Sequence, residues 1–120
     1  MNQNSIDLKQ LLYLIREQKD TEINLNLDEG CVLETEDPKP LVKVLNYLIN
    51  YLAQLNNQSI EISLDLLPEH YRLSLLAYTV AKSLPEISSQ LNEALQPYRA
   101  SLKTDHHSGS YIQLTMLFEK

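Results

Sequence analysis

The stretch that decides the fold is "DPKPLVKVLNYLINYLAQL", residues 37–55. Its apolar side chains recur every three or four positions, which places them along one face of an α-helix. They are Leu41, Val44, Leu45, Leu48, Leu52 and Leu55. Asp37 can cap the first turn, and Pro38 and Pro40 fall where a missing N–H group costs little. The stretch therefore predicts an amphipathic helix that ends in "NNQ", residues 56–58.

The segments on either side switch between helical spacing and the every-second-position spacing of a strand with one buried face. The first half of the chain is predicted to form a helix over 5–20, a strand over 21–30 and the helix over 37–55. A strand pair follows over 59–67 and 71–80, with a turn at 68–70. The last part is predicted to form a helix over 85–100 and a second strand pair within 100–120 that turns at Ser108, Gly109 and Ser110. We therefore expect one α+β domain over residues 1–120, in the order α-β-α-β-β-α-β-β. Three helices should cover one face of a mixed, mostly antiparallel sheet of about five strands, as a two-layer sandwich.

Composition narrows the range of partners. The 120 residues include 10 basic and 16 acidic side chains, a formal charge of −6, and the basic ones are scattered, which argues against nucleic-acid binding. The single cysteine, Cys31, cannot form an internal disulfide and fits a reducing compartment. No secretory signal or membrane-spanning run is evident, so we expect a cytoplasmic chain that binds no membrane. The acidic run Glu34, Glu36 and Asp37 is expected to be a solvated loop that caps the helix.

The ordered elements resemble the ATP-binding domain of the histidine kinase, gyrase, Hsp90 and MutL superfamily, most closely that of sensor histidine kinases and stand-alone anti-sigma-factor kinases. "DPKPLVKVLNYLIN", residues 37–50, is similar to the family's signature helix, which starts at Asp-Pro and continues as Val-Leu-x-Asn-Leu-Leu-x-Asn-Ala. The helix that starts with "DL" at Asp7 and the last hairpin are similar to the family's first helix and closing strands. The resemblance covers nearly the whole chain and implies the same fold.

The chain departs from the family at the signature asparagines. Aligned without a gap from Asp37, the helix places Tyr47 and Tyr51 on the two asparagine positions, the second of which is the family's magnesium ligand. Asn46 and Asn50 each stand one residue early, about 100° around the helix. A neutral phenol is a poor ligand for magnesium, which prefers carboxylate or amide oxygen. We expect the two rings to fill the pocket instead.

The next nucleotide motif is also missing. In the family Asp-x-Gly-x-Gly follows the second hairpin strand, and its carboxylate recognises adenine. Here Ala77, Tyr78, Thr79, Val80 and Ala81 follow "LSLL". The family's glycine-rich lid is absent too, since only "VAKSLPEISSQ", residues 80–90, precedes the third helix. Because these motifs of the family are missing, we expect a domain that uses no cofactor and is not an enzyme.

The histidines offer weaker candidates. His106 and His107 are predicted at a hairpin tip and His70 in a turn, where surface positions are expected and a metal or phosphoacceptor role is the alternative. Adjacent histidines on a strand point to opposite faces, so we expect no metal site. Asp105, His106 and Ser108 contain the residue types of a catalytic triad, but neighbours in one turn rarely reach its geometry and no oxyanion hole is evident.

The tyrosines suggest another use of the former nucleotide site. Tyr47, Tyr51 and Tyr78 are expected to line it, either as core filling or as a surface that holds another protein, since tyrosine is enriched at interfaces. Three further apolar side chains need covering, which a homodimer interface would provide; they are Leu76, Leu84 and Leu117.

We therefore expect a non-catalytic protein-interaction module in bacterial signalling, whose partner is another signalling protein, such as a kinase or its partner. One alternative is the binding of a nucleotide or other small ligand without hydrolysis. Another is a phosphotransfer partner that accepts phosphate on a histidine. A retained cavity with convergent polar groups would favour the ligand, and a site filled by Tyr47 and Tyr51 would favour the interaction module.

Overall fold

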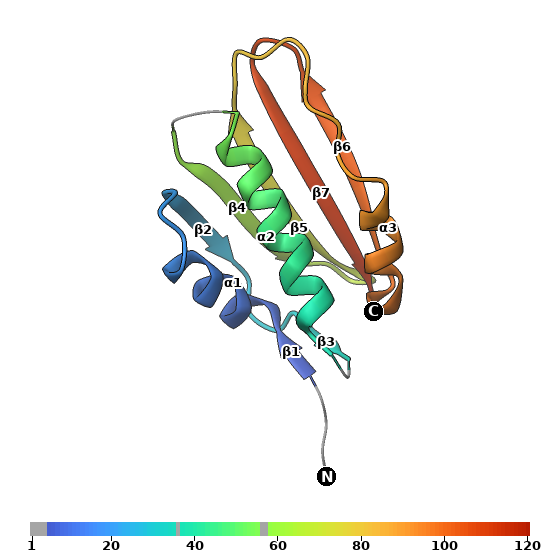
Figure 1. Cartoon of the computed structure of the whole chain (residues 1–120). Coiled ribbons are helices and arrows are strands. Elements are labelled where there is room, and N and C mark those ends of the chain that lie inside the picture. Colours follow the sequence, from blue (N-terminus) through green and yellow to red (C-terminus); the bar gives the residue numbers. More distant parts are fainter. Residues whose placement is uncertain (1–4, 36, 56–57) are drawn as a thin grey trace.

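A computed structural model describes residues 5–35, 37–55 and 58–120 of the chain. Its elements are β1 (Ser5–Asp7), α1 (Leu8–Glu17), β2 (Ile23–Leu27), β3 (Val32–Glu34), α2 (Lys39–Ala53), β4 (Ile60–Leu66), β5 (His70–Tyr78), α3 (Gln90–Leu95), the 3-10 turn η1 (Gln96–Tyr98), β6 (Ala100–His107) and β7 (Tyr111–Glu119). Figure 1 shows their arrangement. Glu36 of the predicted acidic run and Asn56 and Asn57 of the predicted helix end lie outside the described residues.

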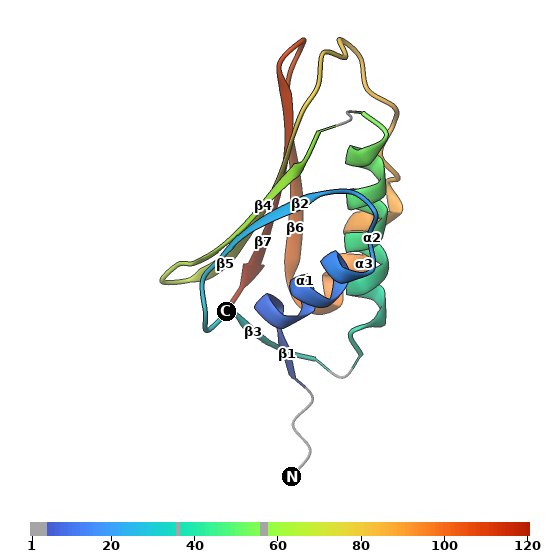
Figure 2. The same ribbon diagram turned by 90° about the vertical axis from the view of Figure 1, so that its left-hand side faces the viewer.

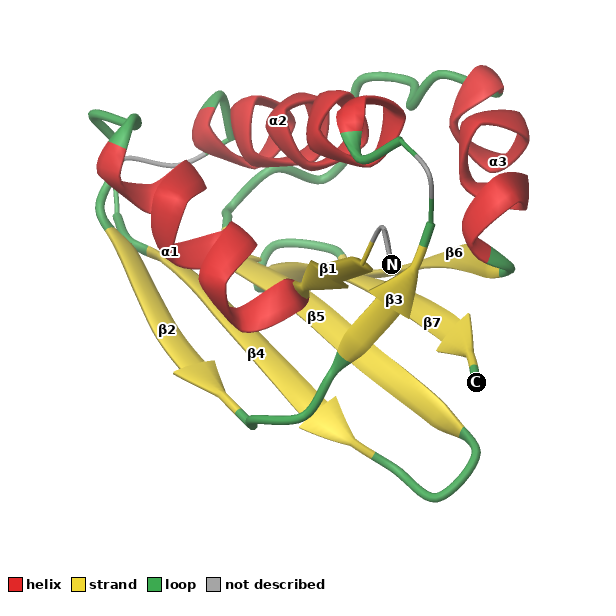
Figure 3. Ribbon diagram, turned by 90° about the horizontal axis from the view of Figure 1, so that it is seen from below, coloured by secondary structure: helices red, strands yellow, loops and turns green. Residues whose placement is uncertain are grey.

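The main sheet has five strands in the order β2-β4-β5-β7-β6. Only β2 and β4 are parallel, and the other three neighbouring pairs are antiparallel. The three helices lie on one face of this sheet and form the second layer (Figures 2 and 3). The predicted α+β two-layer sandwich is therefore confirmed.

The element order contains two strands that the periodicity did not predict. β1 and β3 pair antiparallel and form a separate small sheet beside α1. Each has three residues, which is too short for an alternating pattern to be recognised. Their pairing places Asp7 next to Val32 of β3, in the segment that leads to α2. Asp7 also caps α1, because its carboxylate accepts a hydrogen bond from the Lys9 amide at 3.0 Å.

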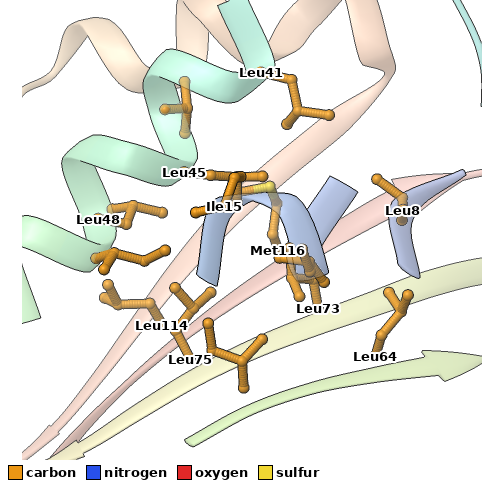
Figure 4. Packing of buried hydrophobic residues seen from close by; sticks show 14 of the residues in the cluster. Leu8, Ile15, Leu41, Leu45, Leu48, Leu64, Leu73, Leu75, Leu114 and Met116 are labelled. Carbon is orange, nitrogen blue, oxygen red and sulfur yellow. The ribbon is translucent and has the colours of Figure 1, made fainter. Parts of the chain in front are cut away.

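The leucine face of α2 packs on the sheet as predicted. Leu41, Leu45 and Leu48 are fully buried on the face of α2 that is turned to the sheet, and Leu114 and Leu75 lie on the sheet side of Leu48 (Figure 4). The helix starts one residue later than an Asp37 cap implies, because Pro38 occupies the cap position. The Asp37 carboxylate nevertheless accepts a hydrogen bond from the Lys39 amide at 3.0 Å and so satisfies one free N–H group of the first turn.

The third helix is shorter than predicted. It was expected over residues 85–100, but α3 begins at Gln90, and η1 follows it directly. The Ser88 hydroxyl accepts a hydrogen bond from the Gln90 amide at 3.2 Å, which turns the chain into the helix at that point. Ile87, expected on the inner side of the helix, instead lies before it and packs against the core from an irregular segment.

Candidate functional site

The predicted site residues come from α2, from the end of β5 and from the irregular chain between β5 and α3. We call residues 79–89 the connection. It leaves β5 near the turn between β6 and β7 and runs along the helical side of the molecule to α3 (Figures 1 and 2). Hydrogen bonds hold it at both ends and in the middle.

Thr79 fixes the start of the connection. Its amide donates to the Ser110 carbonyl at 2.9 Å, in the turn between β6 and β7. Its hydroxyl donates to the Leu55 carbonyl just beyond α2, also at 2.9 Å, and accepts from the Ala81 amide at 3.1 Å. The side chain is buried. Thr79 therefore joins the end of β5 to the C-terminal end of α2.

The Ala81 carbonyl forms the next attachment. It accepts from the Gly109 amide at 3.2 Å and lies 3.1 Å from His106 Nε2, a hydrogen bond in the tautomer that carries its proton there. His106 is thus half-buried and engaged with the connection. Its neighbour His107 is exposed, and its ring stacks on Tyr111 with the ring centres 4.4 Å apart.

These positions correct part of the prediction for the histidines. His106 and His107 are the last two residues of β6 rather than the hairpin tip, because the turn itself comprises only residues 108–110. His70 is the first residue of β5 and not part of a turn. Within the described ranges no group of three or more His, Cys, Asp or Glu side chains is placed to hold a metal ion.

Tyr47 and Tyr51 hold the far half of the connection. The Tyr51 hydroxyl donates to the Pro85 carbonyl at 2.6 Å, and the Tyr47 hydroxyl accepts from the Ser88 amide at 3.0 Å. The two rings lie one helical turn apart, with centres 6.5 Å apart and planes inclined by 18°. Tyr51 is only 6% exposed and Tyr47 is 36% exposed. The two tyrosines therefore attach the connection to α2.

Burial also affects the protonation of Tyr51. It raises the pKa of the Tyr51 phenol above its usual value, and the neighbouring Tyr47 raises it further. A neutral phenol keeps its proton, so Tyr51 remains a hydrogen-bond donor to the Pro85 carbonyl at neutral pH.

Tyr78 does not join the pair, contrary to the expectation that three tyrosines line one site. Side chains alternate along β5, so Ala77 is fully buried under the helices while Tyr78 is 50% exposed. Tyr78 is opposite Tyr111 in the sheet and lines a separate depression of about 360 Å³ together with Gln54 and Val80. The alternation was visible in the sequence and could have separated Tyr78 from the other two.

Of the three leucines expected to need covering, one is already covered. Leu84 lies in the connection and packs against the core. Leu76 and Leu117 are half-buried and lie on β5 and β7, at alternating positions between core residues. Their side chains therefore belong to the sheet face opposite the helices.

A groove between α2 and α3 contains residues that sequence reasoning missed. Its volume is about 560 Å³, and buried Val44 and Leu91 lie at its base. Exposed Lys39, Lys43 and Gln90 stand at its edge. The groove depends on where α3 begins, and the sequence pattern placed that start too early.

A third tyrosine, Tyr98 of η1, anchors the first turn of α2. Its hydroxyl donates to the Asp37 carbonyl at 2.7 Å and accepts from the Leu41 amide at 3.1 Å. The side chain is 5% exposed. Burial raises the pKa of the phenol, while the Leu41 amide lowers it. The partners are 57 and 61 residues away in sequence, so no local pattern could have indicated this contact.

Comparison with known proteins identifies the fold. The sequence matches no protein-family model and no curated protein. Among solved structures, the histidine kinase domain of the E. coli osmosensor EnvZ superposes with a TM-score of 0.77 at 11% identity, over 99% of this chain and 89% of that one. Acinetobacter baumannii histidine kinase AdeS gives 0.69 at 13%, over 99% and 68%. Full-length ShkA in complex with AMPPNP gives 0.74 at 10%, over 98% and 31%.

The chain thus has the fold of histidine kinase ATPase domains. The resemblance inferred from the order of the elements and the helix at 37–55 is confirmed at the level of the fold. None of the described helices has the length and hydropathy needed to cross a membrane.

Proposed function

We propose that this chain is a non-catalytic protein-interaction domain of bacterial signalling, built on the histidine-kinase-like ATPase fold and acting in the cytoplasm. Its partner is another signalling protein, either a kinase or a protein that a kinase recognises. One observation carries the proposal: the hydroxyls of Tyr47 and Tyr51 bind the backbone of the connection. By the resemblance, these are the positions where the family has its two asparagines.

The chemistry of the pair argues against magnesium-nucleotide binding. A magnesium ion needs oxygen ligands with free lone pairs at about 2.1 Å in octahedral geometry. The Tyr51 hydroxyl is a neutral phenol, which is a poor ligand for magnesium; its proton points to the Pro85 carbonyl and its ring is buried. At the end of β5, where the family has an adenine-binding carboxylate, stand the methyl group of Ala77 and the hydroxyl of Thr79, which donates to the Leu55 carbonyl and accepts from the Ala81 amide. Neither residue supplies a carboxylate for an adenine amino group.

The groove between α2 and α3 is the surface we propose for the partner. It combines an apolar base at Val44 and Leu91 with the half-exposed ring of Tyr47. An aromatic ring at the edge of an apolar groove can bury a large area while its hydroxyl remains hydrogen-bonded. Lys39 and Lys43 add positive charge at the edge of the groove. A partner with an acidic rim around an apolar side chain would be complementary.

Calorimetric titration with Mg-ATP, Mg-ADP and Mg-AMPPNP tests the loss of nucleotide binding. We expect no saturable heat with the wild-type chain and no shift in melting temperature. ShkA, which was crystallised with AMPPNP, serves as the positive control. A Tyr47→Asn, Tyr51→Asn double variant, which restores the family's residue types, shows whether the tyrosines alone block binding. Saturable binding of Mg-ATP to the wild type would contradict the proposal.

Site-specific photo-crosslinking in bacterial cells tests the interaction surface. A benzoylphenylalanine at exposed Gln90, in the groove, should capture a signalling protein. The same probe at exposed Asn24, on β2, is the matched control and should not capture it. Equal capture at both positions, or no signalling protein captured at Gln90, would refute the groove as the docking site.

The same groove supports a second candidate, the binding of a small anionic ligand without hydrolysis. Its volume of about 560 Å³ lies within the common range for ligand pockets, about 300–1,000 Å³. Two cations, Lys39 and Lys43, line the groove together with one carboxylate, that of Asp37. If a nucleotide or phosphorylated metabolite raises the melting temperature, Lys43→Gln should abolish the effect and Lys103→Gln, on the sheet, should retain it. Retention in Lys43→Gln would exclude this site.

A further inference from the structure

The outer edge of the sheet at β6 has features of a pairing surface. β6 is the last strand of the sheet and has eight residues, whereas the opposite edge strand β2 has five. The Glu119 amide bonds to the Arg99 carbonyl at 3.0 Å, which fixes which residues of β6 exchange hydrogen bonds with β7. In an antiparallel pair these residues alternate, so Ser101, Lys103 and Asp105 bond to β7.

The intervening residues therefore turn their backbone groups to the open edge. They are Leu102, Thr104 and His106. No strand lies beside β6 on that side in the described part of the chain. At the centre of the strand Lys103, Thr104 and Asp105 are all exposed, even though Thr104 faces the helical side. α3 covers the beginning of β6 and leaves this centre open (Figure 1).

Charge on this edge is arranged symmetrically about Thr104. Lys103 precedes it and Asp105 follows it, so both side chains project from the sheet face away from the helices. Neither forms an ion pair with any residue that the structure describes, although three other ion pairs are present. An unpaired lysine on an edge strand usually discourages strand addition. Asp105 offsets this repulsion when the added strand places a lysine opposite Asp105 and an aspartate opposite Lys103.

That partner is a second copy of the same strand. If two β6 strands run antiparallel about a two-fold axis at Thr104, Lys103 of each copy lies opposite Asp105 of the other. The backbone pattern agrees with this register. Thr104 would exchange both its hydrogen bonds with Thr104 of the second copy, and Leu102 would do so with His106. Lys103 and Asp105 would then form the closer, non-hydrogen-bonded type of pair, in which side chains interact most strongly.

We propose that the outer edge of β6 is a homodimerisation surface, at which two copies pair antiparallel about Thr104 and join their sheets. A two-fold axis at Lys103 or Asp105 would place like charges opposite each other. The charges therefore select one register and one kind of partner. This inference does not depend on the proposed function and concerns a different surface.

A single added strand pair buries less than the roughly 1,200–2,000 Å² of typical stable interfaces, so the dimer should be weak and concentration-dependent. Sedimentation velocity over a wide range of protein concentration should show a monomer–dimer equilibrium. Thr104→Pro removes an outward amide hydrogen and leaves the bonds to β7 intact, as proline on an edge strand does. We expect this variant to remain monomeric, with a circular dichroism spectrum like that of the wild type.

Charge inversion provides a test that does not rely on proline. Lys103→Asp would place aspartates opposite aspartates, and Asp105→Lys would place lysines opposite lysines, so each variant alone should be monomeric. Mixed together, they should form a heterodimer, because each strand then meets opposite charges. Asp20→Lys, at an exposed position after α1, makes the same charge change as Asp105→Lys and should leave the wild-type dimer unchanged.

Three results would overturn the proposal. One is a wild-type chain that stays monomeric at every concentration. Another is a dimer that persists in Thr104→Pro and in both charge variants, which would place the interface elsewhere. The last is a mixture of Lys103→Asp and Asp105→Lys that fails to associate while the wild type dimerises.

Discussion

The two ends of α2 are attached to the rest of the molecule by the same chemistry but with different consequences. At its start the Tyr98 hydroxyl is bonded twice, to the Asp37 carbonyl and the Leu41 amide. In its later half Tyr47 and Tyr51 each make one bond to the irregular connection. In all these contacts a phenol satisfies a backbone group.

The difference lies in what each contact holds. Tyr98 joins η1, which leads directly into β6, to the helix that covers the sheet, so breaking it disturbs the core. The connection has no regular secondary structure and contains several exposed residues, among them Lys82, Ser83 and Glu86. A segment of that kind can open locally while the sheet stays folded. We infer that Tyr98 stabilises the fold, whereas Tyr47 and Tyr51 control whether the surface of α2 is covered.

The largest expected effect sets the scale for the comparison. Leu48 is fully buried on the face of α2 that packs on the sheet, so Leu48→Ala should lower the free energy of unfolding by about 2–5 kcal/mol. Urea denaturation followed by circular dichroism measures it. Lys43→Ala, on the exposed side of the same helix, should change it by no more than about 0.5 kcal/mol. Similar values for both variants would show that α2 does not pack on the sheet through its leucine face.

Tyr98→Phe should have the next largest effect. It leaves the Asp37 carbonyl and the Leu41 amide without their partner, which should cost about 1–3 kcal/mol of global stability. Tyr13→Phe, at an exposed position on α1, is the control and should be nearly neutral. A neutral Tyr98→Phe would mean that water replaces the hydroxyl and that the start of α2 is not anchored there.

Tyr51→Phe and Tyr47→Phe should separate local from global stability. Each loses one hydrogen bond to the connection, worth about 0.5–1.5 kcal/mol, so the global unfolding free energy should fall less than in Tyr98→Phe. Hydrogen exchange of the Ser88 amide should accelerate in Tyr47→Phe, while exchange in β5 and β7 stays unchanged. If exchange in the sheet accelerates equally, the connection is part of the core and the comparison fails.

The sequence predicted which residues lie on α2 better than it predicted what their hydroxyls bind. The leucine face of α2 and the positions of Tyr47 and Tyr51 followed from a long, uninterrupted helical pattern. What the two hydroxyls bind could not be predicted, because Pro85 and Ser88 are 34 and 41 residues away. The start of α3 was predicted too early because the spacing of apolar residues does not show where hydrogen bonds begin the helix. The helical spacing extends back to Ile87, but α3 begins only at Gln90, whose amide donates a hydrogen bond to the Ser88 hydroxyl.

The smallest expected effect is a difference in pH dependence above pH 10. Burial raises the pKa of both Tyr51 and Tyr98 above 10.0, the value for an exposed tyrosine. The folded chain therefore keeps the proton more tightly than the unfolded one. The stability contributed by each neutral phenol is fully present below pH 10 and is lost as the pH rises through the raised pKa.

Replacing either tyrosine with phenylalanine should flatten this decline, because phenylalanine has no proton to lose. At Tyr51 burial and the neighbouring Tyr47 both raise the pKa of the phenol, whereas at Tyr98 burial and Asp37 raise it and the Leu41 amide lowers it. Denaturation midpoints of the wild type and the two variants, measured from pH 8 to 11, would test this. An alkaline decline as steep in both variants as in the wild type would show that the folded chain does not hold these two protons more tightly than the unfolded one.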